Sequence, residues 1–192
     1  MNTNTESIHA VKQDNARVPK LIASSAAAKL GMALVVVSLL LTIPCARAQT
    51  KLSTGDNDFI LAAAQRGMTE VKLSELASDR GMRDGVKEVG HLMAKDHTAI
   101  NVDLKALATQ KGVILSSRLD AKHQEMVGKV AALTDSDFDD AYTAVMLKVL
   151  KTEARNFKAE SEGTRDADIK SFVDKSTPIV VEYLMRITAM QR

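Results

Sequence analysis

The sequence predicts an all-α protein, a four-helix bundle with a short crossover helix between the second and third long helices. Three observations support this fold class. Proline and glycine are sparse after residue 48, and strong helix formers such as alanine, leucine, lysine and glutamate predominate there. Apolar residues recur with the helical period of about 3.6 in five successive segments. No useful length of chain alternates apolar and polar residues, so no sheet is expected.

The first 48 residues have the features of an export signal. An uncharged apolar run at residues 30–43 follows several basic residues and precedes Ala46-Arg47-Ala48. This order is typical of a signal peptide cleaved after Ala48, and the run is shorter than the ~20 residues that span a bilayer. We therefore expect an exported, periplasmic protein with no stable membrane span after cleavage. The alternative is an uncleaved segment that anchors the N-terminus in the membrane.

Removal of residues 1–48 changes the composition. This segment carries five of the 26 basic residues, two of the 24 acidic residues and the single cysteine, so 21 basic and 22 acidic residues remain. A nearly neutral chain offers no basic face for nucleic acid, and a chain without cysteine offers no disulfide or thiol chemistry. The rest is expected to form a flexible leader, residues 49–55, and one domain, residues 56–191.

The apolar pattern predicts five helices, at residues 56–80, 84–111, 118–133, 136–162 and 165–191. Short polar residues suited to helix N-termini stand at or near four of the starts: Asp56, Asp84, Ser136 and Asp166. Glycines that suit C-terminal ends follow or close the long helices: Gly81, Gly112 and Gly163. Pro178 is expected to kink the last helix, because it removes one internal hydrogen bond.

The short segment 118–133 has an apolar stripe of its own, formed by Leu119, Met126, Val130 and Leu133. A helix of ~16 residues spans about 24 Å, much of the length of a bundle. Such an element could return the chain to the opposite end. The result would be two antiparallel hairpins joined by a crossover, the connectivity of ferritin-like bundles. Simple up-down-up-down connectivity is the alternative.

Helical wheels place three ionisable residues among the apolar residues that face the core. Glu70 lies in the middle of the inner face of the first helix, and His97 continues the apolar stripe of the second. Glu153 lies among the inward residues of the third long helix. Glu88 and His91 have the Glu-x-x-His spacing of many metal sites, but they fall on the outer side and are expected to be exposed to solvent.

An isolated charge in a helical core is costly, so these inward residues need partners. One hypothesis is a buried hydrogen-bonded network that fixes the helix register, formed by Glu70, His97, Tyr142, Thr177 and Tyr183. A second is a mononuclear site in which Glu70, His97 and Glu153 bind one iron, manganese or zinc ion. Proton transfer by Glu70 and His97 is a third.

No catalytic motif supports a nucleophilic or nucleotide-dependent enzyme. The domain has no cysteine, no Gly-x-Ser-x-Gly sequence, no second inward histidine and no glycine-rich loop. We therefore expect a non-catalytic structural or binding role in the periplasm or cell envelope, in stress or assembly. The alternative is a ferritin-like metal-binding protein that acts as a store, a sensor or an oxidoreductase. Homo-oligomerisation and an envelope protein partner both stay open.

Several motifs of the domain occur together in one known family. They are the inward glutamate Glu70, the Met-x-x-Asp-His sequence that ends at His97, the Phe-Asp-x-x-Tyr sequence that ends at Tyr142, and the late proline Pro178. Residues 56–191 thereby resemble domain-of-unknown-function family 4142, exported bacterial proteins that look ferritin-like. The resemblance implies the fold, export and a buried site, and it implies no particular reaction.

Two positions depart from the pattern of that family. Many relatives carry a histidine eight residues after the tyrosine and another shortly after the late proline, and these positions are Leu150 and Tyr183 here. The resemblance therefore implies a reduced set of ligands in this chain. Glu153, one turn from Leu150, could compensate in part.

Overall fold

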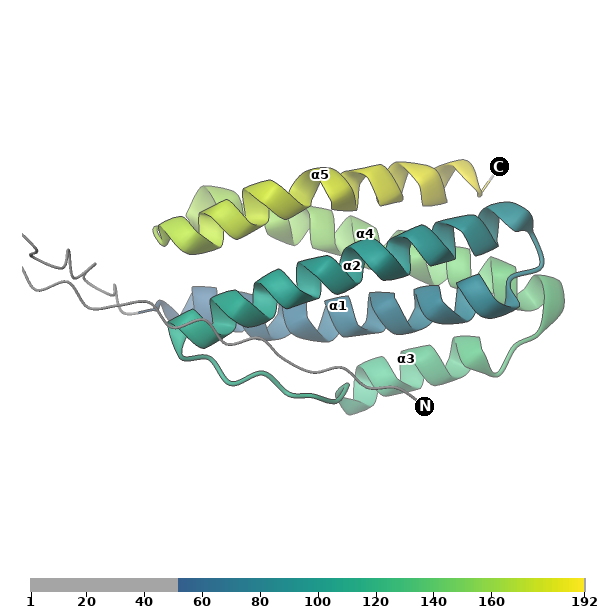
Figure 1. Ribbon diagram of the computed structural model, residues 1–192, viewed down its shortest axis with the longest axis horizontal. Coiled ribbons are helices and arrows are strands. Elements are labelled where there is room, and N and C mark those ends of the chain that lie inside the picture. The colour runs from purple at the N-terminus through teal and green to yellow at the C-terminus, as the bar shows by residue number, and fades with distance from the viewer. Residues whose placement is uncertain (1–51, 192) are drawn as a thin grey trace, which may run out of the picture. The chain divides into compact units, whose positions relative to one another are not determined.

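A computed structural model describes residues 52–191, and this part of the chain contains five α-helices and no strand (Figure 1). The helices are α1 (Thr54–Arg80), α2 (Asp84–Lys111), α3 (Ala121–Ala131), α4 (Asp135–Gly163) and α5 (Ala167–Ala189). The predicted all-α bundle is confirmed. None of the helices in the described residues is both long and apolar enough to cross a membrane. The predicted export signal, residues 1–48, lies outside the described residues.

The four long helices form two hairpins that pack against each other. α1 packs on α2 and α4 on α5, while contacts of α1 with α4 and of α2 with α5 close the bundle. Arg83, just before α2, bonds to Asp139 near the start of α4, and Lys111, the last residue of α2, bonds to the N-cap of α5. α2 and α4 therefore run in the same direction, and α5 runs in the opposite one.

α3 supplies the crossover between the hairpins. It lies alongside α1, contacts α4 and carries the chain back to the end where α4 begins (Figure 1). Arg80 at the end of α1 donates hydrogen bonds to the carbonyl oxygens of Ala131 and Leu133, which fix the end of this element. The crossover connectivity, rather than up-down-up-down, is the one observed.

The N-caps of α1, α2 and α4 differ from the predicted residues, although α2 begins at Asp84 as predicted. α1 begins at Thr54 because Ser53 is its N-cap: the Ser53 hydroxyl accepts from the Asp56 amide at 3.0 Å, and the Asp56 carboxylate reaches back to Ser53 in a capping box. α2 and α4 start after Arg83 and Thr134, without a side-chain cap. Asp166 caps α5 as predicted. α5 continues through Pro178.

The two helices of the first hairpin approach each other closely at Gly90. A Cβ atom there would lie 2.6 Å from the backbone nitrogen of Ser78 and 2.8 Å from the backbone oxygen of Ser74. Both atoms belong to the backbone of α1, so neither can move aside easily. Glycine at this position therefore sets the distance between α1 and α2.

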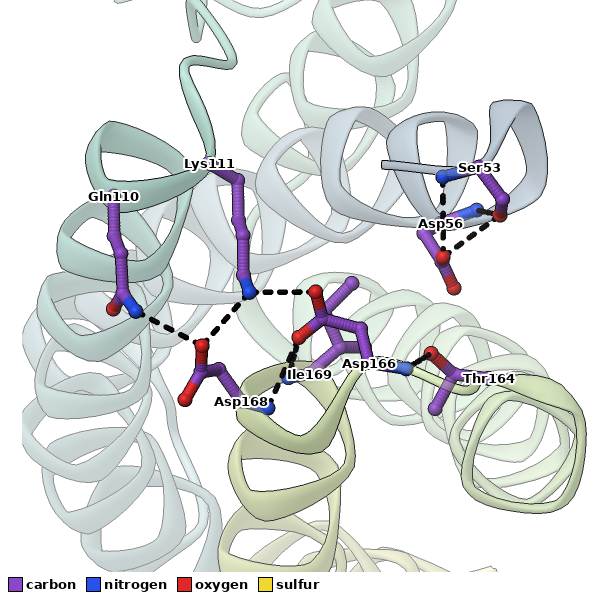
Figure 2. Close-up of polar contacts among 8 residues, drawn as sticks. All are labelled: Ser53, Asp56, Gln110, Lys111, Thr164, Asp166, Asp168 and Ile169. Atoms are coloured by element: carbon purple, nitrogen blue, oxygen red, sulfur yellow. Dashed lines mark hydrogen bonds and ion pairs between the residues drawn. The ribbon is translucent and has the colours of Figure 1, made fainter. Parts of the chain in front are cut away.

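Charged residues tie the helices together at both ends of the bundle. At one end, Asp166, the buried N-cap of α5, and the neighbouring Asp168 accept hydrogen bonds from Lys111 Nζ at 2.6 and 2.8 Å (Figure 2). At the other end, buried Asp139 accepts from the backbone amides of Met82 and Arg83, at 3.0 and 2.8 Å. The core lies between these two sets of contacts, and it contains the inward polar residues.

Candidate metal centre

Three ionisable side chains from three helices meet in the middle of the core. Glu70 of α1, His97 of α2 and Glu153 of α4 have 0%, 1% and 2% of their surfaces exposed. One potential ligand atom from each residue lies within 4.8 Å of those of the other two. The structure therefore brings together the three residues that the sequence analysis suggested as metal ligands.

The three residues are joined by hydrogen bonds through Glu70. The Nδ1 atom of His97 lies 3.0 Å from Oε2 of Glu70, and Glu153 is hydrogen-bonded to the same carboxyl group. Since Glu70 is the acceptor for both neighbours, it is the natural carrier of the negative charge in this cluster.

The two carboxyl groups have opposite pKa shifts. Burial acts to raise the pKa of Glu70, but the attraction of His97 and the hydrogen bonds from His97 and Glu153 outweigh it, so the pKa lies below its ordinary value. Burial raises the pKa of Glu153 well above its usual range, and the negative charge of Glu70 raises it further. In the cluster without metal, the negative charge therefore lies preferentially on Glu70 and the proton on Glu153.

Hydrogen bonds within the cluster leave three of its atoms without a partner. Oε1 of Glu70, Oε2 of Glu153 and Nε2 of His97 are buried and make no hydrogen bond in the described residues. A buried polar atom without a partner costs about 1–3 kcal/mol. Three such atoms in one cluster are a feature of sites that bind a ligand.

Two tyrosines lie near the cluster, each with a partner outside it. The ring of Tyr183 lies 5.6 Å from the ring of His97, and its hydroxyl group donates to Asp96 at 2.6 Å. The hydroxyl group of Tyr142 lies 3.4 Å from the Ser74 hydroxyl group, and burial raises its pKa to about 12. Both tyrosines therefore enclose the cluster and are not hydrogen-bonded to Glu70 or His97.

The hypothetical network of five polar residues is thus divided in the structure. Glu70 and His97 are hydrogen-bonded to each other. Thr177 is only partly buried, and its hydroxyl group donates at 2.7 Å to the carbonyl oxygen of Val173, one turn earlier in α5. Leu150, at a position where relatives are expected to carry a histidine, is fully buried on α4, one turn before Glu153.

Comparison with known protein families identifies the family of this chain. Residues 42–190 match the family described as Domain of unknown function (DUF4142). The chain belongs to this family. Its description assigns no activity.

Other comparisons give the fold of this DUF4142 protein without an activity. A search of curated proteins finds no match. The crystal structure of a DUF305 fragment from Deinococcus radiodurans is similar, with a TM-score of 0.63 and 8% sequence identity, over 72% of this chain and 96% of the fragment. At that identity the likeness concerns the fold alone.

The donor set of the DUF4142 protein fits one transition-metal ion better than two. Two carboxylates and one imidazole are ligands suited to iron, manganese or zinc. A ferritin-type dinuclear centre needs four carboxylates and two histidines from four helices. The described residues offer three ligands from three helices. Glu88 and His91 are exposed, as predicted.

Sequence reasoning missed Arg66, which lies next to the cluster. Its positive charge lowers the pKa values of both Glu70 and Glu153, while its Nε and Nη2 atoms are buried and make no hydrogen bond. Arg66 and Glu70 are four residues apart on α1, a spacing that places side chains on neighbouring turns of one face. That spacing was the available signal, because at 100° per residue it puts Arg66 only about 40° from Glu70 on the helical wheel.

Proposed function

We propose that this DUF4142 protein binds one divalent iron, manganese or zinc ion in its core through Glu70, His97 and Glu153. The observation that carries the proposal is the convergence of three buried ligand groups from three helices, each of which has an atom without a hydrogen-bond partner. Apolar cores rarely accept three ionisable groups unless the groups share a ligand or pair completely.

Proton release is the expected signature of a divalent ion bound at this place. The metal-free cluster has one negative carboxylate, Glu70, and one proton held by Glu153. Carboxylates bind metals in the ionised form, so an ion would replace the proton of Glu153 and neutralise both carboxylates. Metal binding should therefore release protons and weaken as the pH falls.

A binding role fits the cluster better than catalysis. The exposed fractions of the three ligands are 2% or less, whereas an enzyme site needs a cleft that admits the substrate. A store, a sensor or a structural centre needs access only for the ion. The predicted export signal is the reason for proposing that this role is carried out in the periplasm or cell envelope.

One specific observation favours a second candidate function, a metal-free bundle whose buried polar residues only fix the helix register. The protonated Glu153, the Glu70 carboxylate and His97 form a continuous hydrogen-bonded set without any ion. In that case, the function lies on the surface of the bundle. Metal analysis separates the two candidates.

The test is elemental analysis of the protein made from the full chain and purified without chelator or metal-affinity tag. Mass spectrometry of the same sample reads the N-terminus and so tests cleavage after Ala48. We expect close to one transition-metal ion per chain, and loss of the ion in His97→Ala and Glu70→Gln. His91→Ala is the matched control, because His91 lies on the exposed side of the same helix.

Circular dichroism of each variant establishes that the bundle is still helical. Metal retention by both His97→Ala and Glu70→Gln would show that the ligand assignment is wrong. Metal-free wild-type protein that also fails to take up added zinc, manganese or iron would favour the second candidate.

A further inference from the structure

A groove separate from the core cluster lies between α1, α3 and α4. Its volume is about 650 Å³, within the range of sites that hold small organic molecules. Part of its wall is apolar and is formed by Ala62 of α1, Met126 of α3, and Val145 and Val149 of α4. The crossover helix therefore does more than return the chain, since it closes one side of this groove.

Positive charge predominates in the groove. Its walls carry Arg66, Lys122, Lys129 and Lys148, against only Asp120 and Glu125. Both acidic groups already have partners on α3: His123 Nδ1 lies 2.8 Å from Asp120, and Lys129 Nζ lies 2.7 Å from Glu125.

The remaining cations have no ion pair within residues 52–191. Lys122 and Lys148 come from opposite sides of the groove, α3 and α4, and neither has a salt-bridge partner in this part of the chain. A groove that has two walls with unpaired ammonium groups attracts an anion, because clefts focus the field of the charges that line them.

Arg66 adds a permanent charge at the inner side of the groove. The guanidinium group cannot lose its proton, and its Nε and Nη2 atoms have no hydrogen-bond acceptor. Its attraction to Glu70 and Glu153 acts through space, without a hydrogen bond from Arg66 to either residue. Arg66 thus lines the groove and contributes a fixed positive charge that attracts a carboxylate.

We propose that this groove binds a small organic carboxylate with an apolar tail. The carboxylate lies among Arg66, Lys122 and Lys148, and the tail packs on Met126, Val145 and Val149. The proposal does not depend on the metal site, because none of the three metal-ligand candidates lines the groove.

The test is calorimetric titration of the protein made from the full chain with three probes. Octanoate combines charge and tail, acetate has the charge alone, and octylammonium has the tail with the opposite charge. We expect saturable one-to-one binding of octanoate, and binding of the other two that is weaker by about tenfold or more, equivalent to about 1.4 kcal/mol.

Charge reversal locates the site. Lys122→Glu combined with Lys148→Glu should weaken octanoate binding by about tenfold or more. Both lysines are exposed, so the fold should tolerate the change. The control is Lys72→Glu combined with Lys151→Glu, the same charge change at exposed lysines of α1 and α4 outside the groove, and it should bind octanoate as the wild type does.

Three results would overturn the proposal: no saturable binding of octanoate, binding of octylammonium as tight as that of octanoate, or equal effects of the two double variants. His97→Ala should bind octanoate normally. Loss of metal with retention of octanoate, or the reverse, thereby distinguishes failure of this proposal from failure of the proposed metal site.

Discussion

Glu153 needs a different protonation state in the metal-free protein and in the metal-bound protein. Without metal its carboxyl group is buried and protonated, and it donates to Glu70. As a ligand it would have to be ionised. A substitution that keeps the shape and the donor but removes the ionisation therefore separates stability from metal binding.

The substitution Glu153→Gln should lower metal content and stabilise the metal-free protein at high pH. The folded-state pKa of Glu153 is raised, so its contribution to stability is complete below the unfolded value and is lost as the pH rises through the folded value. Glutamine has no proton to lose. Urea unfolding in the presence of chelator at pH 6 and pH 9 is the measurement.

The control is Glu162→Gln, an exposed glutamate of the same helix, which should leave both metal content and pH dependence unchanged. An equally steep loss of stability with rising pH in Glu153→Gln and in the wild type would contradict the protonation of Glu153.

The site could be predicted from the sequence only in part, and the residues show why. A helical wheel gives the angle of a side chain, and that angle was enough for Glu70, His97 and Glu153, which all point inward. A wheel gives no depth along the bundle and no hydrogen-bond partner. Thr177 therefore passed as a network member, although its hydroxyl group bonds within α5.

At the scale of the element, the close approach of α1 and α2 at Gly90 gives a sharp prediction. Gly90→Ala should reduce the free energy of unfolding by about 1–3 kcal/mol, because the added methyl group meets the backbone of α1 and the helices must move apart. Urea-induced unfolding followed by circular dichroism measures the change.

Gly128 of α3 is the matched control. A Cβ atom there would meet nothing within 4 Å, and alanine is the better helix former. Gly128→Ala should therefore stabilise the protein by about 0.5–1 kcal/mol. Equal effects of the two substitutions would show that helix propensity, rather than the contact between α1 and α2, decides the outcome.

The helix boundaries show what local sequence decides and what tertiary contacts decide. The bounds of α2 were predicted correctly, since Gly112 ends it in the left-handed conformation at a φ of 72°. The start of α2 has a different cause from the one expected: the two residues before it, Met82 and Arg83, donate their backbone amides to Asp139, more than 50 residues away in the chain. Such a long-range anchor leaves no local pattern in the sequence.

At the scale of the whole molecule, one end of the bundle makes stability depend on pH. Asp56 of α1 and Glu160 of α4 are hydrogen-bonded to each other, and Asp56 is also hydrogen-bonded to Thr164, the residue that follows α4. Burial, the hydrogen bond to Asp56 and the negative charge of Asp56 together raise the pKa of Glu160 to about 7. Glu160 therefore holds a proton that joins α1 to α4.

Glu160→Gln should flatten the dependence of the melting temperature on pH between pH 4.5 and pH 7. A raised folded-state pKa means that wild-type stability falls as the pH rises through this window. Glutamine retains the donor at every pH. Thermal unfolding in chelator at pH 5 and pH 8 measures the difference.

The comparison for this variant is Glu75→Gln, an exposed glutamate of α1. It should melt with the same pH dependence as the wild type. A wild-type melting temperature that rises steadily from pH 5 to pH 8 would mean that Glu160 is already ionised in this range.

The division of the ligands between the two hairpins affects how long a bound ion would stay in the site. Glu70 and His97, 27 residues apart, meet as soon as the first hairpin forms, whereas Glu153 arrives only when the second hairpin docks after the crossover. An ion bound by all three would cross-link the hairpins and could leave only when they separate. Its residence time would then be set by the opening rate of the bundle rather than by the strength of its bonds.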